Sequence, residues 1–422
     1  MNKSELIDFY HTVRKTTERL CQPLCTEDHV IQSMPDVSPP KWHLGHTTWF
    51  FEQVILGRFL AEYRPFHELY AFLFNSYYQS FGDRVRREVR GTLSRPTVQE
   101  IRTYRSAVDD QMHTFLEKAD QESFQQVSPL VELGLHHEQQ HQELLVTDIK
   151  HILGSNPLRP AYRVAERNGA AEGASGPARF VPVAGGVFEI GAGPEGFAWD
   201  NERPRHRVML GDFLLMNRPV SCREYLEFMQ DGGYQNPLLW LSDGWDAVCS
   251  ERWQAPLYWE HVEGNWRIFT LSGTRTVAPD EPVCHVSFYE AAAFARWAGK
   301  RLPSEFEWEV AAGKAGSQPR GSLLEDATWH PVPSRPGSAD AAFHQLLGGV
   351  WEWTNSSYLP YPGYQQERGP LGEYNGKFMI NQMVLRGGSC ATPRSHIRPT
   401  YRNFFQCDKR WQFSGIRLAS DP

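Results

Sequence analysis

The chain has 422 residues, which is enough for two or three domains. Its net charge of −7 excludes the basic surface typical of nucleic-acid-binding proteins, and no apolar run reaches the length of a membrane span. The seven cysteines are odd in number and contain no C-x-x-C pair, so we expect a reducing, cytoplasmic environment and no disulfide framework. Nothing in the sequence requires an obligate protein partner.

Residues 1–160 are predicted to form a bundle of four helices. Apolar residues recur every three or four positions in four segments, which are Leu6–Leu20, His43–Leu60, Ile101–Phe115 and Leu130–Leu153. A capping box, Thr97 with Glu100, precedes the third segment. The stretch Asn75–Arg95 lacks this periodicity and is predicted to be a long loop.

The second segment carries two candidate histidines, His43 and His46. It follows Ser38-Pro39-Pro40, a typical helix start. His46 lies on the apolar stripe of the helix, whereas His43 lies one position off it. Periodicity alone leaves both residues open as candidates for a site in the bundle core.

The fourth segment holds a second pair of histidines. His137 and His141 are one helical turn apart, on a stripe that also holds Leu133 and Asp148. Two imidazoles at i and i+4 can share a metal ion, although such a pair by itself does not identify the metal. With one histidine of the second segment they would form a three-nitrogen site in the bundle core. Three neutral ligands leave coordination positions open, as in a catalytic site.

The same stretch also fits the H-E-x-x-H pattern of zinc peptidases, with Glu138 as the general base. That alternative needs a third ligand downstream. Residues 142–151 do not supply the Gly and His offsets of metzincins, and Glu166 lies in a predicted linker. The upstream histidines are therefore better candidates for the third ligand.

The composition changes after the bundle. Residues 161–178 are rich in Gly and Ala and are predicted to be a flexible linker. Residues 179–422 are rich in Gly, Pro and Trp, with short strands such as Phe188–Ile190. Two helices stand out in this part, Cys222–Met229 and Ser287–Ala298. We predict a second domain of α+β class, dominated by loops and short strands.

Motifs in both halves resemble known families. The C-terminal half resembles the formylglycine-generating enzymes, whose fold is related to C-type lectins, through five ordered motifs: Pro282–Ser287, Arg301–Glu309, Gly348–Trp353, Leu385–Ser389 and Gly415–Leu418. Trp42–His46 and His137–His141 resemble the metal-binding segments of DinB-type four-helix bundles. This combination resembles the ergothioneine sulfoxide synthases, which use non-haem Fe(II) and O2 to join a thiol to hercynine and form a sulfoxide.

The resemblance implies a set of site residues. It selects His46 over His43, so that His46, His137 and His141 would bind Fe(II). Arg87 and Arg90 would hold the carboxylate of the thiol, for which the bidentate guanidinium is suited. The residues expected to contact hercynine are Gln140, Asn403 and the aromatic side chains Phe404, Trp411 and Trp353, since aromatic faces bind quaternary ammonium groups. Tyr77 and Tyr78 are the candidate catalytic tyrosines for proton transfer or for handling reduced oxygen.

The chain departs from its relatives at two places. Formylglycine-generating enzymes carry a pair of copper-binding cysteines, and Thr392 and Ile397 stand there in this chain. That oxidase chemistry is therefore not expected, because Cys390 and Cys407 are out of register. Synthases that use γ-glutamylcysteine have an acidic residue where this chain has Phe405, which favours free cysteine as the sulfur donor.

Three further functions compete with the sulfoxide synthase. A three-histidine iron site with bound cysteine could act as a thiol dioxygenase, which would consume O2 without hercynine. A DinB-like bundle could instead be a zinc-dependent thiol transferase, which needs no O2. The lectin-related half leaves a non-catalytic ligand-binding module as the last alternative.

Overall fold

A computed structural model describes residues 1–76, 82–163, 176–316, 321–334, 342–366, 372 and 375–422. The chain divides into two compact units. One contains Met1–Tyr162, and the other contains Arg163–Gln365 and Asn375–Pro422. The division falls at the start of the predicted linker, most of which lies outside the described residues.

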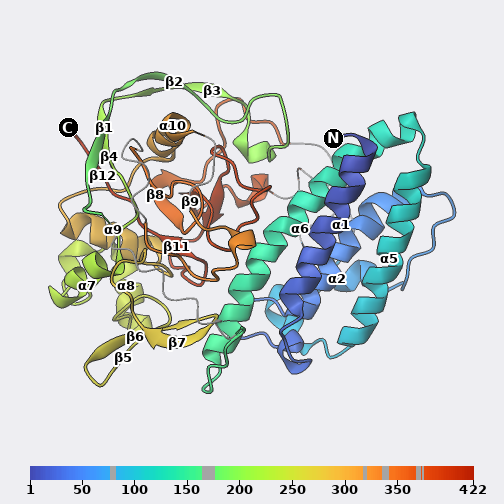
Figure 1. The fold of residues 1–422 in the computed structure, drawn as a ribbon, viewed down its shortest axis with the longest axis horizontal. Helices are drawn as coiled ribbons and strands as arrows, with labels where there is room; N and C mark the ends of the chain where they lie inside the picture. The colour runs from blue at the N-terminus through green and yellow to red at the C-terminus, as the bar shows by residue number, and fades with distance from the viewer. Residues whose placement is uncertain (77–81, 164–175, 317–320, 335–341, 367–371, 373–374) are drawn as a thin grey trace. The chain divides into compact units, whose positions relative to one another are not determined.

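The first unit is helical (Figure 1). Its four long helical segments pack along one another, and two of them carry the histidines singled out above. Its elements are α1 (Lys3–Cys21), η1 (Glu27–Val30), α2 (Pro40–Phe50), η2 (Phe51–Leu56), α3 (Gly57–Phe59), α4 (Tyr70–Leu73), η4 (Arg87–Thr92), α5 (Val98–Lys118) and α6 (Gln121–Ser155). The predicted four-helix bundle is therefore the architecture of this unit.

Helix ends follow local capping chemistry. The predicted capping box before α5 is confirmed, because Thr97 accepts from the backbone of Glu100 and Glu100 accepts from the backbone of Thr97. The predicted start of the last helix at Leu130 is wrong. The side chain of Asp120 caps α6, which begins at Gln121 and continues through Pro129.

Helix α2 is buried on all sides. Every residue from Pro40 to Phe50 is buried, and a π-helical segment, η2, continues it to Leu56. An apolar stripe therefore cannot separate His43 from His46, because both histidines face protein. The prediction of a loop over 75–95 is wrong at its C-terminal end, where η4 forms a 3₁₀-helix.

The described residues of the second unit form four small sheets. Their strand orders are β1-β4-β12, β10-β9-β8-β11, β2-β3 and β5-β6-β7. The strands are β1 (Phe180–Val183), β2 (Gly186–Ile190), β3 (His206–Leu210), β4 (Phe213–Met216), β5 (Trp259–Val262), β6 (Asn265–Thr270), β7 (Gly273–Thr276), β8 (Trp351–Ser357), β9 (Met383–Arg386), β10 (Asn403–Phe405), β11 (Ser414–Gly415) and β12 (Ala419–Ser420). Pairing is antiparallel throughout except between β11 and β8, which are parallel.

Four α-helices accompany these sheets in the part of the unit that the structure describes. They are α7 (Cys222–Gln230), α8 (Ser242–Glu251), α9 (Phe288–Trp297) and α10 (Glu305–Ala315). The two predicted helices correspond to α7 and α9, and sequence periodicity missed α8 and α10. The capping box of Ser304 with Glu307 marks the start of α10 and was the available signal.

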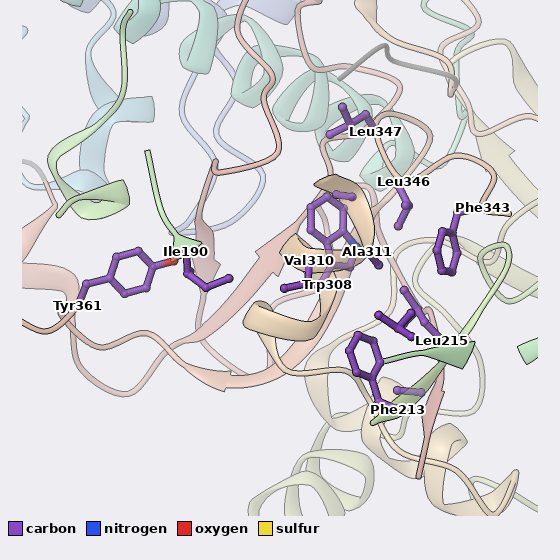
Figure 2. Close-up of a cluster of buried hydrophobic side chains, with 13 residues drawn as sticks. Ile190, Phe213, Leu215, Trp308, Val310, Ala311, Phe343, Leu346, Leu347 and Tyr361 are labelled. Atoms are coloured by element: carbon purple, nitrogen blue, oxygen red, sulfur yellow. The ribbon is translucent and has the colours of Figure 1, made fainter. Parts of the chain in front are cut away.

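A hydrophobic core in the second unit joins α10 to the strands around it. Figure 2 shows Trp308, Val310 and Ala311 of α10 beside Ile190 and Leu215. Beside this core, Glu352 accepts hydrogen bonds from Trp308 Nε1 at 2.6 Å and from Arg417 Nη2 at 2.6 Å. Trp308, Glu352 and Arg417 come from three of the motifs, which thus meet at one buried carboxylate. Glu352 and Arg417 form a buried ion pair, in which loss of either charge would leave the other uncompensated.

None of the described helices is sufficiently long and apolar to span a membrane. All seven cysteines are free. Thr392 is buried and accepts a hydrogen bond from the backbone of Ser389, while Cys390 is buried separately from the half-buried Cys407. The cysteine pattern therefore provides no disulfide.

Candidate metal centre

Three buried histidines meet between α2 and α6. His46 comes from α2, while His137 and His141 come from successive turns of α6, and their ligand atoms all lie within 4.8 Å of one another. His46 Nε2 is 3.3 Å from His137 Nε2. Two nitrogens bound at about 2.0–2.1 Å to one metal ion lie about 3 Å apart, so the pair fits a shared ion. No other such cluster of three occurs in the described part of the chain.

Burial keeps these imidazoles in the form that binds metal. Loss of hydration lowers the pKa of His137 to about 4. The pKa values of His46 and His141 lie well below their usual value, first because of burial and then because of the charge of neighbouring His137. Neutral imidazoles offer a lone pair to a cation at physiological pH, so the donor set fits a transition metal.

The ring of His46 is held from both its edge and its faces. Its Nδ1 lies 2.6 Å from the carbonyl oxygen of Phe74, so Nδ1 carries the proton and Nε2 keeps its lone pair for the cluster. Trp42 stacks on one side, with ring centroids 4.6 Å apart, and Trp49 on the other at 5.7 Å. The orientation of this ring is therefore fixed before any metal binds.

Arg90 extends this stack rather than pointing away from it. Its guanidinium carbon lies 3.4 Å from the centroid of the Trp42 ring. Arg90 is buried and donates to the hydroxyls of Ser38 at 2.9 Å and Ser76 at 3.0 Å. These contacts make Arg90 a support of the metal-ligand helix, and its predicted role in binding the thiol stays a prediction.

Arg87 lies one turn before Arg90 and differs from it in exposure. It is half-buried and donates to the backbone carbonyl of Asp36. Its buried Nε has no hydrogen-bond partner among the described residues. Of the two predicted carboxylate-binding arginines, Arg87 is the less buried.

His43 lies beside the cluster and does not join it. Its Nδ1 is 2.9 Å from Nδ1 of His141, and its Nε2 is 3.0 Å from Oδ2 of Asp148. The structure thus separates the two histidines of α2, which periodicity had left open. The sequence contained one signal of this contact, since Asp148 is a charged residue on an otherwise apolar stripe with His137 and His141.

Glu138 points away from the cluster into a buried ion network. It accepts hydrogen bonds from Arg105 at 2.6 Å, Arg14 at 2.8 Å and Thr17 at 2.6 Å. Burial alone would raise the pKa of Glu138, but the two guanidinium groups outweigh it and hold the pKa at about 2. The peptidase alternative fails here, because its general base is a structural anion.

The remaining predicted residues of the first unit are only partly described. Gln140 lies on α6 directly before His141 and is partly exposed. Tyr77 and Tyr78 lie outside the described residues, so their predicted catalytic role is untested.

The predicted hercynine-contacting residues of the second unit lie on or near β10. The Asn403 side chain accepts a hydrogen bond from the backbone of Phe404 at 2.9 Å. The Phe404 ring stacks on Tyr358, with centroids 4.0 Å apart, while the buried Trp411 packs against the edge of Phe405. Their contacts with a ligand remain predictions.

One aromatic assignment is wrong. Trp353 was expected to offer a face to the trimethylammonium group, but its side chain is completely buried. Its Nε1 donates to the carbonyl of Val286 at 2.9 Å, and its ring packs on Phe288. Trp353 is therefore a core residue, because the motif that contains it belongs to the central strand β8.

Two family models match the chain. Residues 169–422 match the sulfatase-modifying factor enzyme 1-like domain, and residues 10–145 match the DinB superfamily. The histidines of the cluster all lie within the second of these matches.

Three curated relatives are similar over large parts of the chain. The hercynine oxygenase of Mycolicibacterium thermoresistibile is 35% identical over 353 residues, covering 76% of this chain and 73% of that protein. The hercynine oxygenase of Mycolicibacterium smegmatis is 36% identical over 318 residues, covering 68% of this chain and 71% of that protein. The formylglycine-generating enzyme of Thermomonospora curvata is 36% identical over 298 residues, but this alignment covers only 57% of the chain and 93% of that protein. The likeness to the hercynine oxygenases therefore spans more of the chain.

Proposed function

The chain belongs to the hercynine oxygenase family, and we propose that it joins the sulfur of a thiol to the imidazole ring of hercynine in ergothioneine biosynthesis. In this reaction O2 takes up four electrons. One oxygen atom enters the product as the sulfoxide, and the other leaves as water with the thiol proton and the ring proton. The observation that carries the proposal is the buried cluster of three neutral imidazoles in a chain of this family.

The donor set favours iron as the metal. Histidine nitrogens suit Fe(II), and a set without carboxylates leaves the full charge of the ion available to a thiolate. Fe(II) held by His46, His137 and His141 would supply the redox chemistry with O2 and open positions for substrates. The protein contributes fixed ligand orientations, which removes the entropic cost of assembling the reactants.

Gln140 is our candidate for orienting the imidazole of hercynine. It follows the ligand His137 by three positions on α6 and directly precedes His141. Its side-chain amide offers both a donor and an acceptor, so it can bind either nitrogen of a neutral imidazole ring. It is partly exposed, as a group that meets a substrate must be.

The second unit contributes the candidate residues for the trimethylammonium end of hercynine. Phe404 is half-buried and stacked on Tyr358, and such electron-rich rings attract a quaternary ammonium group. We assign Phe404 and Trp411 to this cation and Asn403 to a hydrogen bond with the same substrate.

Arg87 is our candidate for the carboxylate of the thiol, because its side chain is half-buried whereas that of Arg90 is buried. Arg90 shares this role only if a ligand displaces its serine partners. Tyr77 and Tyr78 remain the proposed tyrosines for proton transfer.

Free cysteine is the proposed sulfur donor. Phe405 stands where synthases that use γ-glutamylcysteine carry an acidic residue, and it packs against Trp411 with ring centroids 5.4 Å apart. An apolar side chain in this place would offer no counter-charge to the amino group of a γ-glutamyl residue.

The proposal is tested by product mass. The protein is loaded with Fe(II) under anaerobic conditions, mixed with hercynine and either cysteine or γ-glutamylcysteine, and exposed to O2. We expect the sulfoxide of the cysteine conjugate and O2 uptake that depends on hercynine. Cysteine sulfinate formed without hercynine would instead identify a thiol dioxygenase, and a native zinc protein without O2 uptake would contradict the oxygenase proposal.

A further inference from the structure

A continuous hydrogen-bonded chain leads from the start of α2 to the ligand His141. The backbone N–H of Ser38 donates to Oδ2 of Asp148 at 2.9 Å, and the same oxygen lies 3.0 Å from His43 Nε2. His43 Nδ1 then lies 2.9 Å from His141 Nδ1. All four residues are buried, so water does not compete for these contacts.

With His43 neutral, this hydrogen-bonded chain has one self-consistent arrangement of protons. A carboxylate oxygen only accepts hydrogen bonds, so His43 must donate to Asp148 from Nε2. The neutral ring of His43 then has its lone pair on Nδ1, and His141 must donate to it from its own Nδ1. The remaining nitrogen of His141, Nε2, is left with a lone pair. Asp148 thus determines, through His43, which nitrogen of His141 is available for coordination.

We propose that His43, held by Asp148, is a positioning residue that makes His141 a stronger electron donor to the metal than His46. This inference rests on the proposed metal centre. A carboxylate behind a ligating imidazole fixes its tautomer and raises its basicity. Here the carboxylate acts through a second imidazole, which carries the same polarisation from Asp148 to His141.

The contrast with His46 supports an unequal ligand set. Nδ1 of His46 is 2.6 Å from the carbonyl oxygen of Phe74, which is a neutral backbone acceptor. His141 instead faces a chain that ends on a charged group. Hydrogen bonds that end on an ionised group are stronger than neutral ones, so the two rings polarise to different extents.

The same contacts align the two ligand helices. Ser38 lies just before α2, and Asp148 lies two turns beyond His141 on α6. Their hydrogen bond and the bond to His43 join the helices at the level of the cluster. The hydrogen bond between Ser38 and Asp148 does not involve His43, so it still joins the helices when His43 is replaced. We therefore expect loss of His43 to disturb metal binding more than it disturbs folding.

The test measures the affinity of the purified chain for Co(II), a spectroscopic substitute for Fe(II), in wild type and variants. His43→Phe keeps an aromatic ring and removes both nitrogens. His43→Gln retains an acceptor for His141 and a donor for Asp148. Asp148→Asn keeps an oxygen that can accept from Ser38 and His43 while removing the charge. His29→Phe is the control, since His29 is as buried as His43 but takes no part in these hydrogen bonds.

We expect His43→Phe to weaken Co(II) binding by about 10- to 100-fold, which is typical for loss of a ligand's hydrogen-bond partner. His43→Gln should restore most of the affinity, and Asp148→Asn should shift the visible Co(II) absorption. Unfolding temperatures of the metal-free proteins identify any variant that simply fails to fold. Equal affinity in His43→Phe and wild type would overturn the inference, whereas absence of Co(II) binding by wild type would instead refute the metal centre itself.

Discussion

Oε1 of Glu138 lies 2.6 Å from Nη2 of Arg105. Glu138 directly follows the candidate ligand His137 in the sequence. The other carboxylate oxygen of Glu138 is 2.8 Å from Nη1 of Arg14. One carboxylate of α6 thereby joins α1 and α5 to the helix that carries two of the three histidines. The acidic residue of the H-E-x-x-H pattern is thus part of the bundle's internal scaffold.

Glu138→Gln is expected to destabilise the first unit strongly. Removing the shared carboxylate leaves Arg14 with Asp109 and Arg105 with the more distant Glu18 as their remaining charged partners. Loss of one partner of a buried ion pair typically costs about 3–5 kcal/mol. Urea denaturation followed by circular dichroism measures this loss. Glu132→Gln, a partly exposed residue of the same helix, is the control and should change stability little. A fully stable Glu138→Gln protein that had lost only catalysis would show that Glu138 acts chemically.

The low pKa of Glu138 predicts a specific dependence of stability on pH. Its pKa is about 2 in the folded chain against 4.5 for an ordinary glutamate, because the cations outweigh the effect of burial. A carboxyl group whose pKa falls on folding stabilises the folded state at pH values above its pKa in the unfolded chain. This contribution is lost as pH falls from about 4.5 towards 2. The shift corresponds to roughly 3 kcal/mol. The difference in unfolding free energy between wild type and Glu138→Gln should therefore shrink across this range, and a difference independent of pH would argue against the ion network.

The bundle could be predicted because its helices follow apolar periodicity and caps, such as Thr97 with Glu100. The start of α6 could not, since the apolar periodicity that predicted the helix begins only at Leu130, whereas the helix begins at Gln121 after its cap, Asp120. Periodicity also failed inside α2, whose residues are buried on every side and so give no stripe to separate His43 from His46. Trp353 shows a third limit, because a motif residue looks the same in sequence whether it lines a site or fills a core.

His46→Ala is expected to remove the metal. The variant loses one of three ligands, so metal affinity should fall by more than the about 10- to 100-fold typical of outer-shell changes. Metal content after dialysis and anaerobic Fe(II) titration measure the loss. His113→Ala, on α5 and outside the cluster, should keep its full metal content. Undiminished metal in His46→Ala would exclude the three-histidine site.

Arg87→Met is expected to raise the KM for the thiol more than it lowers kcat. A charge-assisted hydrogen bond contributes about 1.5–3 kcal/mol, so kcat/KM for cysteine should fall by about 10- to 150-fold. The KM for hercynine should not change. Arg86→Met, at an exposed neighbouring position, is the matched control. An unchanged KM for cysteine would remove Arg87 from the thiol site.

Phe405→Asp is expected to shift the preference for the sulfur donor from cysteine towards γ-glutamylcysteine. The new carboxylate would offer a counter-charge to the amino group of the γ-glutamyl residue, which cysteine lacks, whereas Phe405 offers only an apolar edge against Trp411. The measurement is the ratio of kcat/KM for the two thiols. A screened or partly exposed ion pair contributes up to about 1 kcal/mol, so we expect a change of about fivefold in this ratio. Phe405→Asn separates charge from size, because it removes the ring equally but adds no charge. An equal shift in both variants would show that space, and not charge, sets the donor preference at this position.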